Sequence, residues 1–272
     1  MLQLSGRRNL DAVQRRLTSP SRRLALLAPP NAFIPNVFSD VRGDDEGHRA
    51  LFSQMQRFRG QVYLKDGAIK QSDLVDGRHV VEADDYSWHL LVHDENGKID
   101  GCIRYQAHDT RSLFCRLSVF STAIAACPRW GPAVKQAVHL EVTRARSLNL
   151  SFVEVGGWAL AEHVRGTSEA LRLGLAAYSL GQLMGGAVGM STATRRHCSS
   201  SILRRMGGES LKYAGVPIPA YYDPQYECEM EILRFSSWSP NPRFTFWVEE
   251  IRQSLQHIPV VGSTDWELAA AG

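Results

Sequence analysis

The 272-residue sequence has few cysteines, and their spacing does not pair them. Structural zinc sites and disulfide frameworks both need sets of cysteines at defined spacings. The number here is odd, and no two form a CxxC motif: Cys102, Cys115, Cys127, Cys198 and Cys228. We therefore expect reduced thiols that act mostly as packing residues in a cytoplasmic protein, and no metal site.

The sequence also lacks a long apolar run and a strong excess of one charge. A membrane-spanning helix needs about 18 or more consecutive apolar residues. The longest candidate, residues 171–190, contains Arg172, Gln182 and several glycines, so we interpret it as a buried helix followed by a strand. The formal net charge of +3 is too small to indicate a nucleic-acid partner.

A basic composition marks the N-terminal part. Three arginine pairs occur there, at positions 7–8, 15–16 and 22–23, and Pro29–Pro30 follows them. We predict a basic N-terminal extension over residues 1–47 and one folded domain over residues 48–272. The extension is either loosely packed or a basic arm that contacts an acidic partner or membrane headgroups.

The folded part alternates helical and strand patterns. Two expected strands, 89–94 and 98–106, flank an Asn-Gly hairpin turn. Helices are expected over residues 48–66, 167–185, 194–208 and 241–258, strands over 186–193 and 226–235, and a strand end with a glycine loop over 150–168. This order predicts an α/β (α+β) domain around a mixed sheet.

Residues 137–148, "AVHLEVTRARSL", have apolar residues at 138, 140 and 142 that alternate with polar ones. Such alternation predicts a half-buried strand. This strand would carry Glu141 and Arg144 near its end, where we expect them to join a polar cluster that lines a cleft.

Several ordered segments resemble acyl-homoserine-lactone synthases. The family patterns are R-x-x-V-F, E-x-D before an apolar strand, G-x-x-R, E-I-S-R, and a late helix with a glycine turn. The matching segments are "RGQVY" (59–63), "EADDYSWHLLV" (82–92), "IDGCIRYQ" (99–106), "LEVTRA" (140–145) and "RRHCSSSILRRMGGESLKYAG" (195–215). Long-chain N-acyl amino acid synthases share this arrangement, and both groups belong to the GNAT N-acyltransferase superfamily.

The resemblance implies a GNAT-like three-layer domain with a centrally splayed mixed sheet. An acyl thioester would lie in the V-shaped gap, and the acyl group would pass to an amine. The chain departs from the lactone synthases in three places: Ser87 replaces their second aspartate, the tryptophan after R-x-x-V-F is missing, and the segment 147–164 is a longer insert. The first two departures count against S-adenosylmethionine as the acceptor, and the third resembles the amino acid synthases.

The catalytic residues that we predict are Glu141, Arg144 and Arg104. Amide formation from a thioester requires a base for the amine, and a partly buried Glu141 would serve as one. Its alternative role is an ion pair with an arginine such as Arg104. The predicted substrate-binding residues are Arg59, Glu82, Asp84 and Trp88. Glu82 and Asp84, two positions apart on a strand entry, would share a face and bind a cationic amine or pair with arginines; the alternative is a solvated acidic turn.

The loop before the helix at 167–185 is the predicted donor site. Backbone N–H groups at a helix N-terminus suit a phosphate or pantetheine arm, and the candidate residues are Arg165, Gly166, Thr167 and Ser168. A basic face would attract an acidic acyl carrier protein; its residues are Arg195, Arg196, Arg204, Arg205 and Lys212. The alternatives are a plain capped helix and a solvated helix face.

We therefore predict an N-acyltransferase that moves a fatty acyl group from an acyl carrier protein or coenzyme A to the amine of an amino acid or related metabolite. It would hold no permanent cofactor and no metal, because its histidines lack metal-ligand spacing. The alternatives are an acyl-homoserine-lactone synthase that uses S-adenosylmethionine, and a non-catalytic module that binds acyl thioesters or partner proteins.

Overall fold

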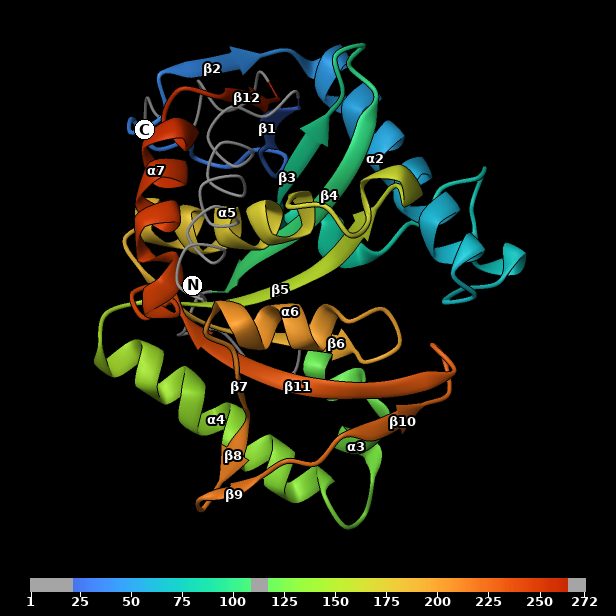
Figure 1. The fold of residues 1–272 in the computed structure, drawn as a ribbon, viewed down its shortest axis with the longest axis vertical. Coiled ribbons are helices and arrows are strands. Elements are labelled where there is room, and N and C mark those ends of the chain that lie inside the picture. The colour runs from blue at the N-terminus through green and yellow to red at the C-terminus, as the bar shows by residue number, and fades with distance from the viewer. Residues whose placement is uncertain (1–21, 109–116, 264–272) are drawn as a thin grey trace, which may run out of the picture.

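A mixed sheet forms the centre of the protein. The structure is a computed structural model that describes residues 22–108 and 117–263. The strand order is β10-β11-β6-β5-β4-β3-β1-β12-β2, with β7 paired to β11 (Figure 1). Neighbouring strands are antiparallel except for β5–β6, β1–β12 and β12–β2, which are parallel. The strands are β1 (Arg23–Leu27), β2 (Asp40–Gly43), β3 (Trp88–His93), β4 (Ile99–His108), β5 (Ser151–Leu160), β6 (Ala187–Thr194), β7 (Glu209–Ser210), β10 (Tyr221–Asp223), β11 (Cys228–Ser236) and β12 (Pro259–Gly262). A separate hairpin pairs β8 (Lys212–Tyr213) with β9 (Val216–Pro217).

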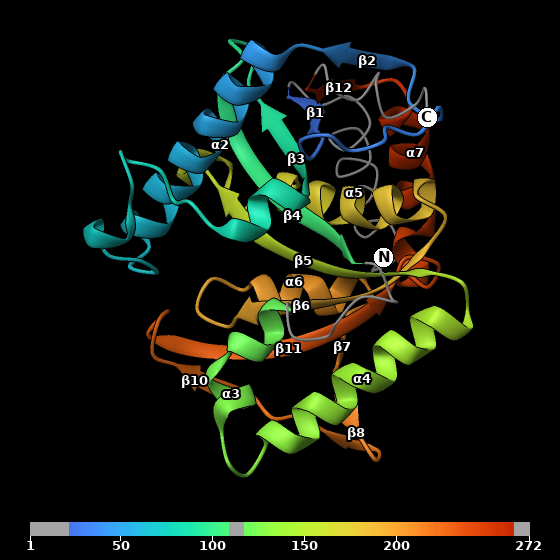
Figure 2. The same cartoon turned by 180° about the vertical axis from the view of Figure 1, so that it is seen from behind.

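Helices cover both faces of this sheet (Figures 1 and 2). On one face, α5 (Glu169–Leu183), α6 (Ser199–Met206) and α7 (Thr245–Leu255) share an apolar core with the sheet. On the other face, α2 (Asp45–Lys65) and α4 (Gly131–Ser147) pack over separate parts of it, and the short α3 (Ala123–Ala126) accompanies α4. Consecutive residues of β3 point to opposite faces of the sheet, since Leu90 packs with α5 and Leu91 packs with α2. The predicted three-layer α/β architecture is therefore confirmed.

Two strands lie inside the segment that we assigned to the N-terminal extension. β1 pairs with both β3 and β12, and β2 pairs with β12. The apolar run Leu24–Leu27 is almost completely buried. Residues 22–47 are therefore part of the sheet and not of a separate extension, because they supply its strands β1 and β2.

The strand expected over residues 137–148 is wrong, because these residues belong to helix α4. The buried residues of α4 recur with helical spacing: Val134, Ala137, Val138, Val142 and Ala145. The alternation that indicated a strand covers only six residues, which is too short to distinguish the two periods. Over the full helix the apolar positions follow the 3.6-residue period of a helix packed on a sheet.

The strand that lies beside β4 is β5, which we had expected to be mainly a glycine loop. It pairs with β6 only over its first four residues, from Ser151↔Ala187 to Glu154↔Met190. Both strands continue beyond this point without pairing to each other, β5 to Leu160 and β6 to Thr194. The sheet is therefore splayed in its middle, as the resemblance implied.

Within the described residues, no helix is long and apolar enough to span a membrane. The four cysteines in this part of the chain are free thiols; Cys115 lies outside the described residues. No group of histidine, cysteine and acidic residues able to hold a metal ion occurs among the described residues.

Candidate active site in the splayed sheet

A cavity of about 650 Å³ occupies the gap between the diverging halves of β5 and β6. Its walls come from both faces of the sheet. Arg59 and Tyr63 of α2 line it on one side, and Ala170 of α5 with Ile202 and Leu203 of α6 line it on the other. The cavity therefore reaches through the sheet, so two ligands can approach one point from opposite faces.

A β-bulge shapes the wall of this cavity on β5. The pairing with β4 shifts from Cys102↔Ala159 to Arg104↔Gly156, which leaves Gly157 out of register. Gly157 has φ +61°, a left-handed conformation that favours glycine. The bulge also exchanges the faces of the strand: Glu154 points to the α2/α4 side, whereas Trp158 packs on the α5 side.

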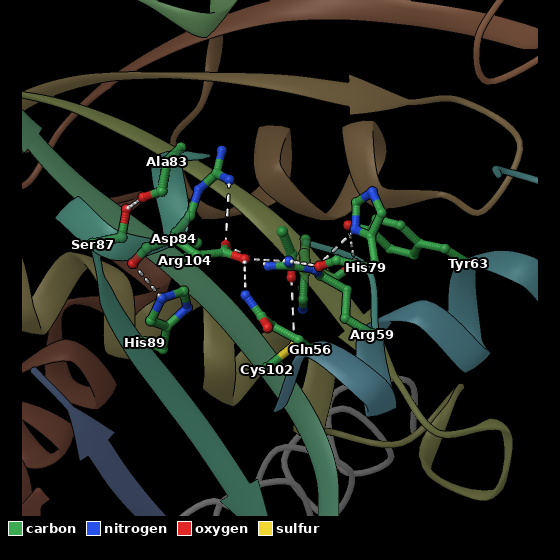
Figure 3. A network of polar contacts seen from close by, with 12 residues as sticks. Gln56, Arg59, Tyr63, His79, Ala83, Asp84, Ser87, His89, Cys102 and Arg104 are labelled. Carbon is green, nitrogen blue, oxygen red and sulfur yellow. Dashed lines mark hydrogen bonds and ion pairs between the residues drawn. The ribbon is translucent and has the colours of Figure 1, made fainter. Parts of the chain in front are cut away.

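A buried ion pair anchors the α2 side of the cavity (Figure 3). Both terminal nitrogens of Arg59 contact the Asp84 carboxylate, at 2.7 and 2.5 Å, and Gln56 Nε2 donates to the same carboxylate at 3.1 Å. The side chains of Arg59 and Asp84 are 1% and 0% exposed. Burial alone would raise the pKa of Asp84, but the hydrogen bonds from Arg59 together with the positive charges of Arg59 and Arg104 outweigh it and hold this pKa below its ordinary value.

Two neutral histidines complete the cluster around this pair. Arg59 Nε donates to His79 Nδ1 at 3.1 Å, and His89 Nε2 contacts the Asp84 carbonyl oxygen at 3.1 Å. Burial lowers the pKa of each histidine to about 4, and the Arg59 charge acts in the same direction. Both imidazoles are therefore neutral near pH 7 and serve as hydrogen-bonding groups.

Arg104 carries a positive charge on the cavity wall, and among the described residues its counter-ion is Asp84, which it shares with Arg59. Its Nη1 lies 3.7 Å from Asp84 Oδ1, and Arg59 already holds that carboxylate at shorter distances. The Arg104 Nε is buried and has no hydrogen-bond partner among the described residues. The cluster of Arg59, Asp84 and Arg104 therefore bears a net positive charge.

Glu154, at the point where β5 leaves β6, is a site residue that our sequence analysis did not identify. It is 5% exposed and accepts from the backbone N–H groups of Ser118 and Val119 and from the Ser118 hydroxyl, at 2.7–3.0 Å. His108 Nε2 lies 3.0 Å from it. Burial would raise the pKa of Glu154, but these donors together outweigh it and lower the pKa. The sequence signal for this site residue is one carboxylate inside the apolar alternation "SFVEV".

The structure brings together only part of the predicted polar cluster. Arg59, Asp84 and Arg104 meet, whereas Glu141 and Arg144 lie apart on α4. Glu141 contacts Arg234 Nε at 2.9 Å and Arg144 Nη1 at 3.3 Å, and it does not line the cavity. The prediction that Glu141 and Arg144 line the cleft is therefore wrong, because the helix α4 directs them to β11 and not to the gap.

We expect Glu141→Gln to leave the predicted thioester transfer unchanged. The substitution weakens two partly exposed ion pairs, to Arg144 on α4 and to Arg234 on β11, so the free energy of unfolding should fall by about 1–2 kcal/mol. Initial rates and urea unfolding of the variant and the parent protein measure both quantities. A loss of rate of tenfold or more, with unchanged stability, would contradict this placement.

Two predicted substrate-binding residues also lie outside the cavity. Glu82 is exposed on the 3-10 turn Glu82–Tyr86, in which Asp84 is buried. The shared face that we expected requires a strand with a period of two, and this segment is a 3-10 turn with a period of three. Trp88 is buried in the core beside Phe38.

The four predicted donor residues lie at the start of α5, and two of them reach the cavity. Arg165 and Gly166 line the cavity. The Arg165 guanidinium is engaged, since its two terminal nitrogens contact Asp66 at 2.8 and 2.7 Å. Thr167 Oγ1 accepts from the backbone N–H of Glu169 at 3.2 Å, and Ser168 is the N-cap residue. The phosphate-binding role of these residues remains a prediction.

The predicted carrier-protein surface is interleaved with acidic residues of β11. Arg195 contacts Glu229 at 2.8 Å, and Arg204 contacts Glu231. Arg196 donates to the backbone oxygen of Glu227, and Arg205 and Lys212 are exposed. The outward-facing glutamates of β11 therefore offset part of the positive charge on which carrier-protein docking was predicted.

The comparisons with known proteins agree with this architecture. No family model matches the chain, and no curated protein matches it. It is similar to the solved structure of BjaI, a CoA-dependent acyl-homoserine lactone synthase with SAM and isopentyl-CoA, at 12% identity and a TM-score of 0.53, over 92% of this chain and 100% of that one. It is also similar to FeeM, an N-acyl amino acid synthase from uncultured soil microbes, at 12% identity and a TM-score of 0.47, over 80% and 92%. The likeness to BjaI shows the fold and confirms the GNAT-like fold that the sequence resemblance implied.

Proposed function

We propose that this protein is an N-acyltransferase that moves an acyl group from a phosphopantetheine thioester to an amine. The observation that carries the proposal is the cavity that passes between the diverging halves of β5 and β6, with helices on both faces contributing to its walls. A reaction between two substrates needs both of them held at one point in attacking geometry. An opening through a sheet meets that need, because each substrate has its own approach.

The α5 side of the cavity suits the donor. Its walls there include Ala170 of α5 and Ile202 and Leu203 of α6, and Arg165 and Gly166, just before α5, also line it. Helix N-termini favour phosphate groups. The BjaI structure, of a CoA-dependent synthase, holds isopentyl-CoA within a similar fold, which supports a CoA-type thioester donor here.

The α2 side suits the acceptor, because it presents polar and charged groups. These are Arg59, Tyr63, His79, Arg104 and Tyr226. Attack of a neutral amine on the thioester carbonyl forms the C–N bond and breaks the C–S bond, with transient negative charge on the carbonyl oxygen. We assign the stabilisation of that oxygen to the bulge at Gly157, where the strand backbone departs from its regular direction.

Incubation with thioesters and amines tests this function. Acyl-CoA and acyl carrier protein thioesters of several chain lengths are combined with a panel of amino acids and with S-adenosylmethionine, and products are identified by mass spectrometry. We expect new amides and release of free thiol that depend on both substrates. A lactone product would instead support an acyl-homoserine-lactone synthase. Thioester binding without formation of any amide or lactone would instead support a non-catalytic module that binds acyl thioesters.

A further inference from the structure

Among the residues that the structure describes, three carboxylates line the cavity, and they differ in how far the protein already engages them. They are Asp66, Glu154 and Asp223. Both oxygens of Asp66 accept from Arg165, and both oxygens of Glu154 accept from the Ser118 segment or lie near His108. A carboxylate held by that many donors is a poor acceptor for a further proton. Asp223 remains as the carboxylate with accepting capacity.

Asp223 ends β10 and begins the tight hairpin to β11. Its Oδ1 accepts from the backbone N–H groups of Gln225 at 3.0 Å and Tyr226 at 3.3 Å, which is an Asx turn. Among the residues that the structure describes, its Oδ2 has no hydrogen-bond or ion-pair partner. The turn therefore uses one oxygen and leaves the other free at the cavity wall.

The free oxygen of this carboxylate faces the cavity. Asp223 is 6% exposed, and no described lysine, arginine or histidine forms an ion pair with it. Its Oδ2 is not among the fully buried atoms that lack a hydrogen-bond partner, so this oxygen is open to the cavity and can meet a ligand there. An asparagine would make the same Asx turn, so the turn alone does not account for an aspartate.

Asp223 lines the same cavity as Tyr226, Arg59 and Arg104. Burial raises the pKa of the Tyr226 hydroxyl, Asp223 raises it further, and Arg104 and Arg59 act against this. The Tyr226 hydroxyl is therefore within electrostatic reach of both Asp223 and Arg104. A ligand that fills this cavity therefore lies among Asp223, Tyr226 and the two arginines.

We propose that Asp223 is a catalytic residue that receives the acceptor amine, an assignment that rests on the proposed acyl transfer. Oδ2 accepts a hydrogen bond from the neutral amine and orients its lone pair toward the thioester carbonyl. As the C–N bond forms, the nitrogen loses a proton to Oδ2. The C–S bond then breaks, and this proton passes to the departing thiolate, which leaves an amide, a free thiol and the original carboxylate.

The substitution Asp223→Asn tests this assignment. Asparagine keeps the Oδ1 acceptor of the Asx turn but replaces Oδ2 with an amide nitrogen that cannot take a proton. We expect kcat to fall by about 10²–10⁴-fold, the usual contribution of a general base. The KM for the thioester and the unfolding midpoint should stay near those of the parent protein. Added formate should restore part of the activity of Asp223→Gly, because the cavity has room for a small carboxylate.

Asp94→Asn is the matched control. Asp94 Oδ1 also accepts two backbone N–H groups in a hairpin turn, from Asn96 at 2.9 Å and Lys98 at 2.8 Å, and it lies outside the cavity. The kcat of the Asp94→Asn variant should equal that of the parent protein. If the parent protein forms amides and Asp223→Asn retains kcat within threefold, the assignment of Asp223 is overturned while the transferase stands. If the parent protein forms no amide from any substrate pair, the proposed function itself fails.

Discussion

Replacing Asp84 with alanine is expected to lower the free energy of unfolding by about 3–5 kcal/mol. The substitution leaves the Arg59 guanidinium, 1% exposed, without the two contacts at 2.7 and 2.5 Å that compensate its burial. Removal of one partner of a buried pair costs more than the pair contributes, because the remaining charge stays desolvated. Urea unfolding followed by circular dichroism measures the change.

The pH dependence of stability gives a second measurement of the same pair. The folded protein lowers the pKa of Asp84 below its ordinary value of 3.8. The stabilising contribution is therefore fully present above about pH 4 and is lost as the pH falls through the lower value of the folded state. The parent protein should lose more stability over this acid range than Asp84→Ala does.

The exposed pair of Glu249 and Arg252 provides the control. Its contacts are as short, at 2.6 and 2.8 Å, but the side chains are 43% and 33% exposed. We expect Glu249→Ala to change the free energy of unfolding by less than about 1 kcal/mol. Equal losses for the exposed and buried pairs would mean that burial does not set the cost at Asp84.

Gly156→Phe is expected to reduce acyl transfer at least 100-fold while the protein stays folded. A Cβ at this position would meet only the Arg104 Nη2, at 3.6 Å, which is ordinary contact. Gly156 lies just beyond the point where β5 leaves β6 and lines the cavity. A phenyl ring there fills the space that the thioester and amine must share, so they no longer reach attacking geometry.

Two small substitutions distinguish blockage of the gap at Gly156 from backbone strain at Gly157. Gly156→Ala should keep transfer within about threefold, because one methyl group leaves the gap open. Gly157→Ala should lose about 1–2 kcal/mol of stability, since the residue has φ +61° and its Cβ would lie 3.2 Å from Arg104 Cβ. Initial rates and unfolding midpoints of the three variants are compared with those of the parent. Full activity of Gly156→Phe would show that the reaction does not use the gap.

Much of the fold was predictable from the sequence, because local periodicity encodes it. The helix over 48–66, the hairpin around Asn96–Gly97, the strand at Gly186–Ala193 and the late strand with alternating glutamates are all present. The resemblance also identified Arg59, Asp84 and Arg104, whose segments keep the family order, and the structure joins them in one cluster.

The rest was decided by tertiary structure. Glu141 and Glu154 both stand inside short apolar alternations, and the sequence offered no reason to prefer the second. The full burial pattern of α4 and the pairing of β5 with β4 distinguish them. Asp223 gave no sequence signal beyond a turn, since Asp-Pro is common in turns. Its significance appears only when the hairpin folds against the gap, because burial and the absence of a partner are properties of contacts between distant segments.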